Sequence, residues 1–241
     1  MVALLFCFGS SLEAEAAEPE VIGRSLQDRP IVLFSSGRAE ATLKVLVVGD
    51  IHGNETAGMR ITRRLVAAAP PAGTELLVVP TINPDGVAAD NRGNDHGVDL
   101  NRNFPFRWRP LGGGEYSGTG PLSEPESRVA GRLILREKPD VTIWFHQPFG
   151  LVDKPEGNPF AAWRYADLIG LPLVGLRGPY PGSASRWQNH ALPESTAFVV
   201  ELPRHVSNAL VRRGTTAVRT LAAELASPRL TNSAPAEKPP L

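Results

Sequence analysis

The stretch Leu43–Val79 reads LKVLVVGDIHGNETAGMRITRRLVAAAPPAGTELLVV, and its pattern decides the fold class. Its two ends, Leu43–Val48 and Glu75–Val79, are short apolar runs bounded by turn residues, which predicts strands buried on both faces. Between them, apolar residues recur at helical spacing from Ala57 to Ala68, and Pro70-Pro71 ends that helix. A strand, a helix and a second strand in this order predict a βαβ unit.

The alternation of strands and helices continues along the chain. Ser123-Glu124-Pro125-Glu126 has the pattern of a capping box and predicts a helix that runs through Leu135. Val141–His146 and Thr196–Leu202 predict two further strands, and an apolar stripe predicts a long amphipathic helix from Pro203 to Ala226. We therefore expect an α/β fold with a mixed, mainly parallel β-sheet and helices on both faces. The site should lie at the carboxyl ends of the strands.

Composition excludes several classes of protein. The 241 residues include 25 Lys and Arg against 25 Asp and Glu, and this zero net charge gives no reason to expect nucleic acid as a partner. No apolar run approaches the ~20 residues that cross a bilayer, so no membrane span is expected. Residues 18–226 show no linker or repeat, which predicts one domain followed by a disordered, Pro-rich tail at 227–241.

The first 17 residues have the pattern of a secretory signal. Val2–Phe8 is apolar, and Ala14-Glu15-Ala16 offers a small-x-small cleavage site, although no basic residue follows Met1. With this signal the protein would be secreted, periplasmic or associated with the cell wall, and without it cytoplasmic. Cys7 is the one cysteine of the chain, so no internal disulfide is possible.

Polar side chains follow the predicted strands where each strand ends. His52 and Glu55 stand three residues apart at a strand-to-helix turn, so their side chains can converge on one point. His146 ends a later strand and would complete a set of two histidines and one glutamate, which leaves a fourth zinc position open for water. Taken singly, each residue also fits a turn or a buried core position, so the spacing alone leaves both interpretations open.

Two blocks make the pattern more specific. Asn83–Gly86 reads NPDG and Gly97–Pro105 reads GVDLNRNFP, and both stand between the HxxE pair and His146. With Glu201 in the last strand, this order resembles the carboxypeptidase A-like zinc carboxypeptidase family over roughly residues 18–226, most closely the bacterial murein peptide amidases. The resemblance implies a phosphorylase/hydrolase-like sandwich. It also implies cleavage of the bond between γ-D-glutamate and meso-diaminopimelate in cell-wall peptides.

The resemblance further implies a metal centre and a base. One zinc ion per chain would be bound by His52, Glu55 and His146. Glu201 matches the general base that takes a proton from water and later returns it to the leaving amine. Its neighbours in the sequence are Val and Leu, and apolar surroundings raise the pKa of a carboxyl group.

Other residues match the part of the family site that binds a small peptide substrate. Arg92 matches the arginine that polarises the scissile carbonyl, and Asn101 with Arg102 matches the pair that holds the terminal carboxylate. Asp99 is interpreted as a turn residue that supports the site. Asn103 is expected to hold the loop together.

One departure from the family concerns the loop before the last strand. The larger digestive-type members carry a tyrosine shortly after a tryptophan, but Trp187 is followed by Gln, Asn and His. Tyr180 lies before the tryptophan and is not equivalent in sequence order. We expect Arg186 or Asn189 to contact the substrate instead, with Arg186 at the distal end of diaminopimelate.

Alternative functions stay open at this point. GDIHGN at Gly49–Asn54 also spells the first block of calcineurin-like metallophosphoesterases, but the later blocks of a two-metal site are missing. A general metallocarboxypeptidase would carry the same ligands and base. A zinc deacylase of the succinylglutamate desuccinylase or aspartoacylase type shares the ligands without the NRNF block. An inactive wall-binding module would keep the fold and lose hydrolysis.

Overall fold

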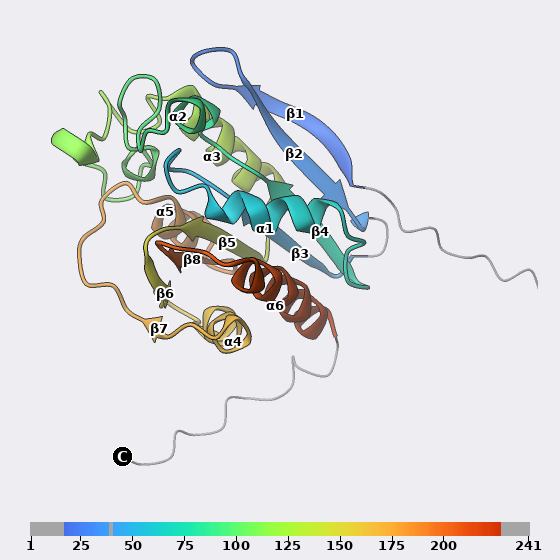
Figure 1. Cartoon of the computed structure of the whole chain (residues 1–241). Helices are drawn as coiled ribbons and strands as arrows, with labels where there is room; N and C mark the ends of the chain where they lie inside the picture. The colour runs from blue at the N-terminus through green and yellow to red at the C-terminus, as the bar shows by residue number, and fades with distance from the viewer. Residues whose placement is uncertain (1–16, 39–40, 228–241) are drawn as a thin grey trace, which may run out of the picture.

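One eight-stranded sheet forms the centre of the computed structural model, which describes residues 17–38 and 41–227 (Figure 1). The order across the sheet is β1-β2-β4-β3-β5-β8-β6-β7. The bounds are β1 Glu18–Arg24, β2 Pro30–Ser36, β3 Leu43–Val48, β4 Thr74–Val79, β5 Val141–His146, β6 Phe149–Asp153, β7 Leu173–Val174 and β8 Thr196–Pro203. The central strands β4, β3, β5 and β8 are parallel, whereas β2 and β6 join them antiparallel on either side.

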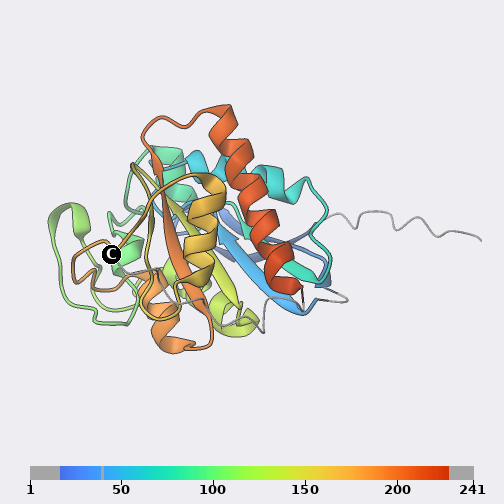
Figure 2. The same cartoon turned by 90° about the horizontal axis from the view of Figure 1, so that it is seen from below.

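Helices cover both faces of this sheet. Their bounds are α1 Ala57–Val66, α2 Pro84–Ala89, α3 Pro125–Glu137, α4 Phe160–Ile169, α5 Ala184–Ala191 and α6 Asn208–Ala226. Buried side chains of α1, α4 and α6 form the core on one face, and those of α3 and α5 form the core on the other. In Figure 2, α4 and α6 lie side by side across the sheet. The predicted α/β fold class is therefore confirmed.

Two expected helix starts are wrong. The N-cap of α3 is Glu124, which makes no side-chain capping bond, and the Ser123 hydroxyl instead donates to the Glu124 carboxylate at 2.6 Å. Pro125 holds the residue before it in an extended conformation, which moves the cap one residue along the chain. Helix α6 begins at Asn208 because the Ser207 side chain accepts a hydrogen bond from the amide of Leu210.

The predictions for the two ends of the chain fall mostly outside the described residues. Residues 1–16 of the expected signal and residues 228–241 of the expected tail lie outside the described residues. No helix among the residues that the structure describes combines the length and the apolar character needed to cross a membrane.

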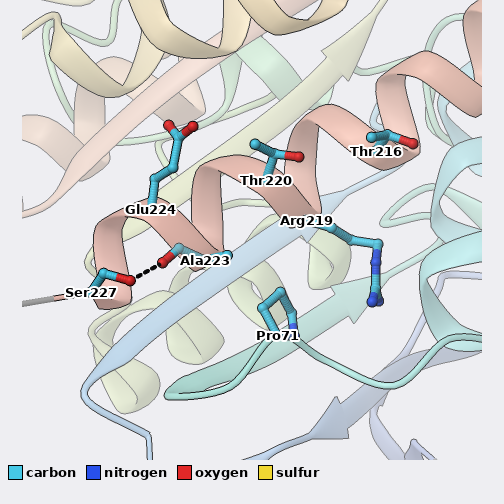
Figure 3. Close-up of a pocket in the computed structure, with 7 residues that line it drawn as sticks. All are labelled: Pro71, Thr216, Arg219, Thr220, Ala223, Glu224 and Ser227. Atoms are coloured by element: carbon cyan, nitrogen blue, oxygen red, sulfur yellow. Dashed lines mark hydrogen bonds between the residues drawn. The ribbon is translucent and has the colours of Figure 1, made fainter.

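A hollow of about 460 Å³ lies beside the last turns of α6 (Figure 3). It is lined by Pro71 and by α6 side chains, and the Arg219 guanidinium there donates to the carbonyl of Ala69. Glu224 at its border is paired with Arg164. This hollow holds no cluster of metal-ligating side chains among the described residues, and it lies where β4 begins. The candidate metal-binding residues lie at the opposite edge of the sheet, where the parallel strands end.

Candidate metal centre and active site

Three adjacent parallel strands bring the expected functional residues together. His52 lies in the turn after β3, His146 is the last residue of β5, and Glu201 lies in β8 directly opposite His146 in the strand register. The turn after β3 is close to the backbone of α2, since a Cβ added at Gly53 would lie 1.9 Å from Gly86. The site therefore forms at the carboxyl edge of the sheet, as the alternation of strands and helices predicts.

The atoms that could bind a metal converge from three side chains. His52 Nδ1 lies 3.0 Å from Glu55 Oε2, and His146 Nδ1 lies 3.1 Å from each of those two atoms. All three residues are buried. Ligands of a tetrahedral zinc ion at 2.0–2.1 Å lie about 3.3 Å from one another, so this set of two imidazoles and one carboxylate fits a single ion. Three protein ligands leave one coordination position open.

Asp99 orients the first of these histidines. His52 Nε2 lies 2.9 Å from Asp99 Oδ1, and donation along this bond leaves the Nδ1 lone pair facing the other two ligands. Burial lowers the pKa of His52, but the carboxylates of Asp99 and Glu55 outweigh burial and raise this pKa to about 9. A metal ion must then displace a proton from His52 at neutral pH, so metal affinity should increase with pH.

The Asp99 contact gives a first prediction. Asp99→Asn should lower metal affinity by about 10–100-fold, because the amide no longer draws the Nε2 proton with a full negative charge. Titration with a competing chelator measures this affinity. Asp90→Asn, on an exposed residue of the same connection, is the matched control. An Asp99→Asn protein that retains wild-type affinity would contradict this role.

Arg92 joins the same cluster. Its Nη1 donates to Glu55 Oε1 at 2.9 Å, while Nε and Nη2 donate to Asp99 Oδ2 at 3.1 and 2.9 Å. Burial raises the pKa of Glu55, but hydrogen bonds from His146 and His52 hold it well below its usual range, so this carboxylate stays ionised. One oxygen of Glu55 thus faces the imidazoles and the other faces the guanidinium.

The cluster opens into a cavity of about 300 Å³ that also contains Glu201. The Oε2 atom of Glu201 is buried without a hydrogen-bond partner among the described residues. Burial, reinforced by the charge of Glu55, raises the pKa of Glu201 to about 7. A carboxyl group with this pKa exchanges protons readily near neutrality.

Asn101 and Arg102 line the same cavity. The Asn101 side-chain oxygen accepts from the amide of Ala184 at 2.9 Å, and the Arg102 guanidinium donates to Glu115 at 2.5 Å. Gly182 has a φ of +69° and lies against the backbone of Arg102. A Cβ added at Gly182 would lie 2.1 Å from the carbonyl oxygen of Arg102. The loop at Gly182 thus fixes the position of the arginine.

The structure brings Arg186 to this cavity but not Asn189. The Asn189 amide group donates to the carbonyl of Ala197 and accepts from its amide, at 2.9 and 2.7 Å. Both ends of this side chain are therefore used to attach α5 to β8. Asn189 lines a small adjoining cavity instead, and its contact with the substrate stays a prediction.

Three polar residues of the cavity were not assigned to the site by sequence reasoning. Tyr180, Glu115 and Asp153 all line it, and the Tyr180 ring lies under the guanidinium groups of Arg102 and Arg186 at 5.5 and 4.8 Å. Each residue stands alone in a loop or at a strand end, where the sequence carries no periodic signal. Asn103, in contrast, holds its loop as predicted, because its Nδ2 donates to Ser117, Gly120 and Ser123.

The class of the protein follows from a sequence match. Residues 11–216 match the Peptidase_M14 zinc carboxypeptidase family, and the chain belongs to this family of metallopeptidases.

The chain is also similar to individual proteins of known name or structure. Murein peptide amidase A of Escherichia coli (strain K12) is 31% identical over 183 residues, which cover 70% of this chain and 75% of the relative. Murein peptide amidase A of Vibrio campbellii is 28% identical over 77% of this chain and 79% of the relative. The crystal structure of murein-tripeptide amidase MpaA from Escherichia coli O157 is similar with a TM-score of 0.73 at 28% identity. This similarity covers 85% of this chain and 91% of that one.

Proposed function

We propose that this protein hydrolyses murein peptides, at the amide bond between γ-D-glutamate and meso-diaminopimelate, with one zinc ion per chain. One observation carries the proposal: the His52, Glu55 and His146 ligand atoms converge in a cavity that Glu201 and Arg102 also line. The similarity to murein peptide amidases supports the choice of peptide.

The proposed reaction uses the zinc ion and four side chains. When bound by the three ligands, zinc supplies a Lewis acid that lowers the pKa of water from 15.7 to about 7. Glu201 accepts the proton of the attacking water and returns it to the amine that leaves. Arg92 lines the cavity, and its positive charge stabilises the negative charge that develops on the carbonyl oxygen. Asn101 and Arg102 bind the carboxylate next to the scissile bond.

Glu115 forms an ion pair with Arg102. Its carboxylate forms the ion pair that a substrate carboxylate needs, and its own side chain is 56% exposed. A substrate must therefore replace Glu115 at the guanidinium. Glu115→Gln should lower KM by about 2- to 5-fold, the range of an exposed ion pair, with little change in kcat.

Arg102→Gln should have the opposite effect and raise KM by at least ~10-fold, since a charge-assisted hydrogen bond to the substrate is lost. Steady-state kinetics on the murein tripeptide separate KM from kcat for both variants. Glu194→Gln, on an exposed residue outside this cavity, serves as the control for charge removal. A rise of KM in Glu115→Gln would show that this carboxylate supports substrate binding rather than competes with it.

An assay of the purified protein tests the proposed function directly. L-Ala-γ-D-Glu-meso-diaminopimelate is offered beside ordinary peptides of similar length with free C-termini. We expect cleavage of the murein tripeptide to exceed that of the ordinary peptides. Efficient release of ordinary C-terminal residues with an intact tripeptide would instead make the protein a general carboxypeptidase.

A further inference from the structure

Two opposite charges line the cavity beyond the metal ligands. Asp153 ends β6 and Arg186 lies in α5, and together with Ser185 and Val199 they line both the main cavity and a small adjoining one. The metal ligands, Glu201 and Arg102 line the same main cavity. A substrate whose scissile bond lies at the metal can therefore extend a side chain between Asp153 and Arg186.

Arg186 is held in place by its surroundings. Its Nη1 donates to the carbonyls of Gly178 and Pro179 at 3.0 and 3.1 Å, and its guanidinium stacks over the ring of Tyr180. The side chain is only 17% exposed. Among the described residues, its one carboxylate neighbour within 4.0 Å is the exposed Glu156, at that limiting distance. A fixed guanidinium with its Nε and Nη2 not hydrogen-bonded to described residues is suited to bind a carboxylate.

Asp153 has the complementary charge and likewise lacks an ion pair. Its Oδ1 accepts from the amide of Leu176 at 2.9 Å, and no cationic side chain of the described residues lies within 4.0 Å of its carboxylate. Burial raises the pKa of Asp153, and the nearby charge of Arg186 lowers it. The two groups are thus close enough to influence each other, yet they do not form an ion pair.

We propose that Asp153 and Arg186 form a subsite for a zwitterionic side chain, with Asp153 binding its ammonium group and Arg186 binding its carboxylate. Two opposite charges that share a cavity wall without pairing can be bridged by a ligand that carries both charges. The far end of a diamino dicarboxylic residue such as meso-diaminopimelate is an α-amino acid and has this pattern. The inference rests on the proposed function, and it makes Asp153 and Arg186 the residues that determine substrate specificity.

Three tripeptides of the form L-Ala-γ-D-Glu-X test the subsite on the wild-type protein. X is meso-diaminopimelate, L-lysine, which lacks the distal carboxylate, or L-2-aminopimelate, which lacks the distal amine. We expect kcat/KM for the diaminopimelate peptide to exceed that for each of the others by at least ~10-fold. Equal cleavage of all three would overturn the subsite while the proposed function stands. Cleavage of none of them, with activity on ordinary peptides, would overturn both.

Single substitutions then separate the two contacts. Arg186→Gln should abolish the preference over the lysine peptide, because kcat/KM for the diaminopimelate peptide should fall by at least ~10-fold more than kcat/KM for the lysine peptide. Asp153→Asn should likewise abolish the preference over the aminopimelate peptide. Arg177→Gln and Asp167→Asn remove the same charges at exposed positions that do not line the cavity, and both should keep the wild-type preferences. An equal loss on all three peptides in either cavity variant would show a merely structural role and overturn the assignment.

Discussion

Glu201→Gln should lower kcat/KM for the murein tripeptide by at least ~10²-fold and leave the metal content at the wild-type level. Glutamine has nearly the same shape but cannot accept the proton of water. Its position in β8 is set by backbone pairing with β5 and β6, which the substitution does not touch. Steady-state kinetics and elemental analysis of the same preparation measure both quantities.

The pH profile gives this prediction a second readout. Because the base must be unprotonated, activity of the wild type is lost as pH falls through the pKa of Glu201. Burial raises that pKa to about 7, and the positive charge of a bound metal lowers it, so the acidic limb of kcat/KM should lie at or below pH 7. Glu224→Gln, at the far edge of the sheet, should keep this limb. Glu201→Gln with more than a tenth of wild-type activity would exclude the residue as the base.

His146→Ala should lose most of the bound zinc and nearly all activity. The substitution removes one of three ligand atoms that lie 3.0–3.1 Å apart, and the cavity offers no described histidine to replace it. Since changes in residues that only orient a ligand cost about 10–100-fold in affinity, loss of the ligand itself should cost more. Elemental analysis of protein purified without added metal should show about one zinc per wild-type chain.

His205→Ala provides the control for this experiment, because His205 is exposed and lies outside the cavity. It should keep both zinc and activity. Zinc bound at the wild-type ratio in His146→Ala would show that other residues hold the ion. Two zinc ions per wild-type chain would favour the two-metal phosphoesterase alternative instead.

The central strands could be predicted from the sequence because they are buried on both faces. Continuous runs such as Leu43–Val48 and Val141–His146 reach their predicted bounds in the structure. The edge strands gave no such signal, since β1 is mostly exposed and β7 spans two residues. Apolar runs in a sequence predict strands well where helices cover both faces of the sheet. They predict strands poorly at edges that are exposed to solvent.

The convergence of the three candidate metal ligands could be predicted for a related reason. His52, Glu55 and His146 follow strands whose ends must meet at one edge, so topology alone brings them together. The rest of the cavity comes from loops, where a single residue such as Asp153 or Glu115 has no pattern around it. The sequence also did not show that the amide group of Asn189 is hydrogen-bonded to the backbone of β8.

The convergence of His52 and His146 has a mechanical consequence. The two imidazoles belong to residues 94 positions apart, at the carboxyl ends of two neighbouring strands. A bound ion therefore acts as a cross-link between distant parts of a chain whose one cysteine cannot form an internal disulfide. At metal concentrations a hundredfold above Kd, such binding adds about 2.7 kcal/mol to the free energy of unfolding. Removal of the metal thus weakens the folded state itself, and a chelator makes the chain easier to unfold and to degrade.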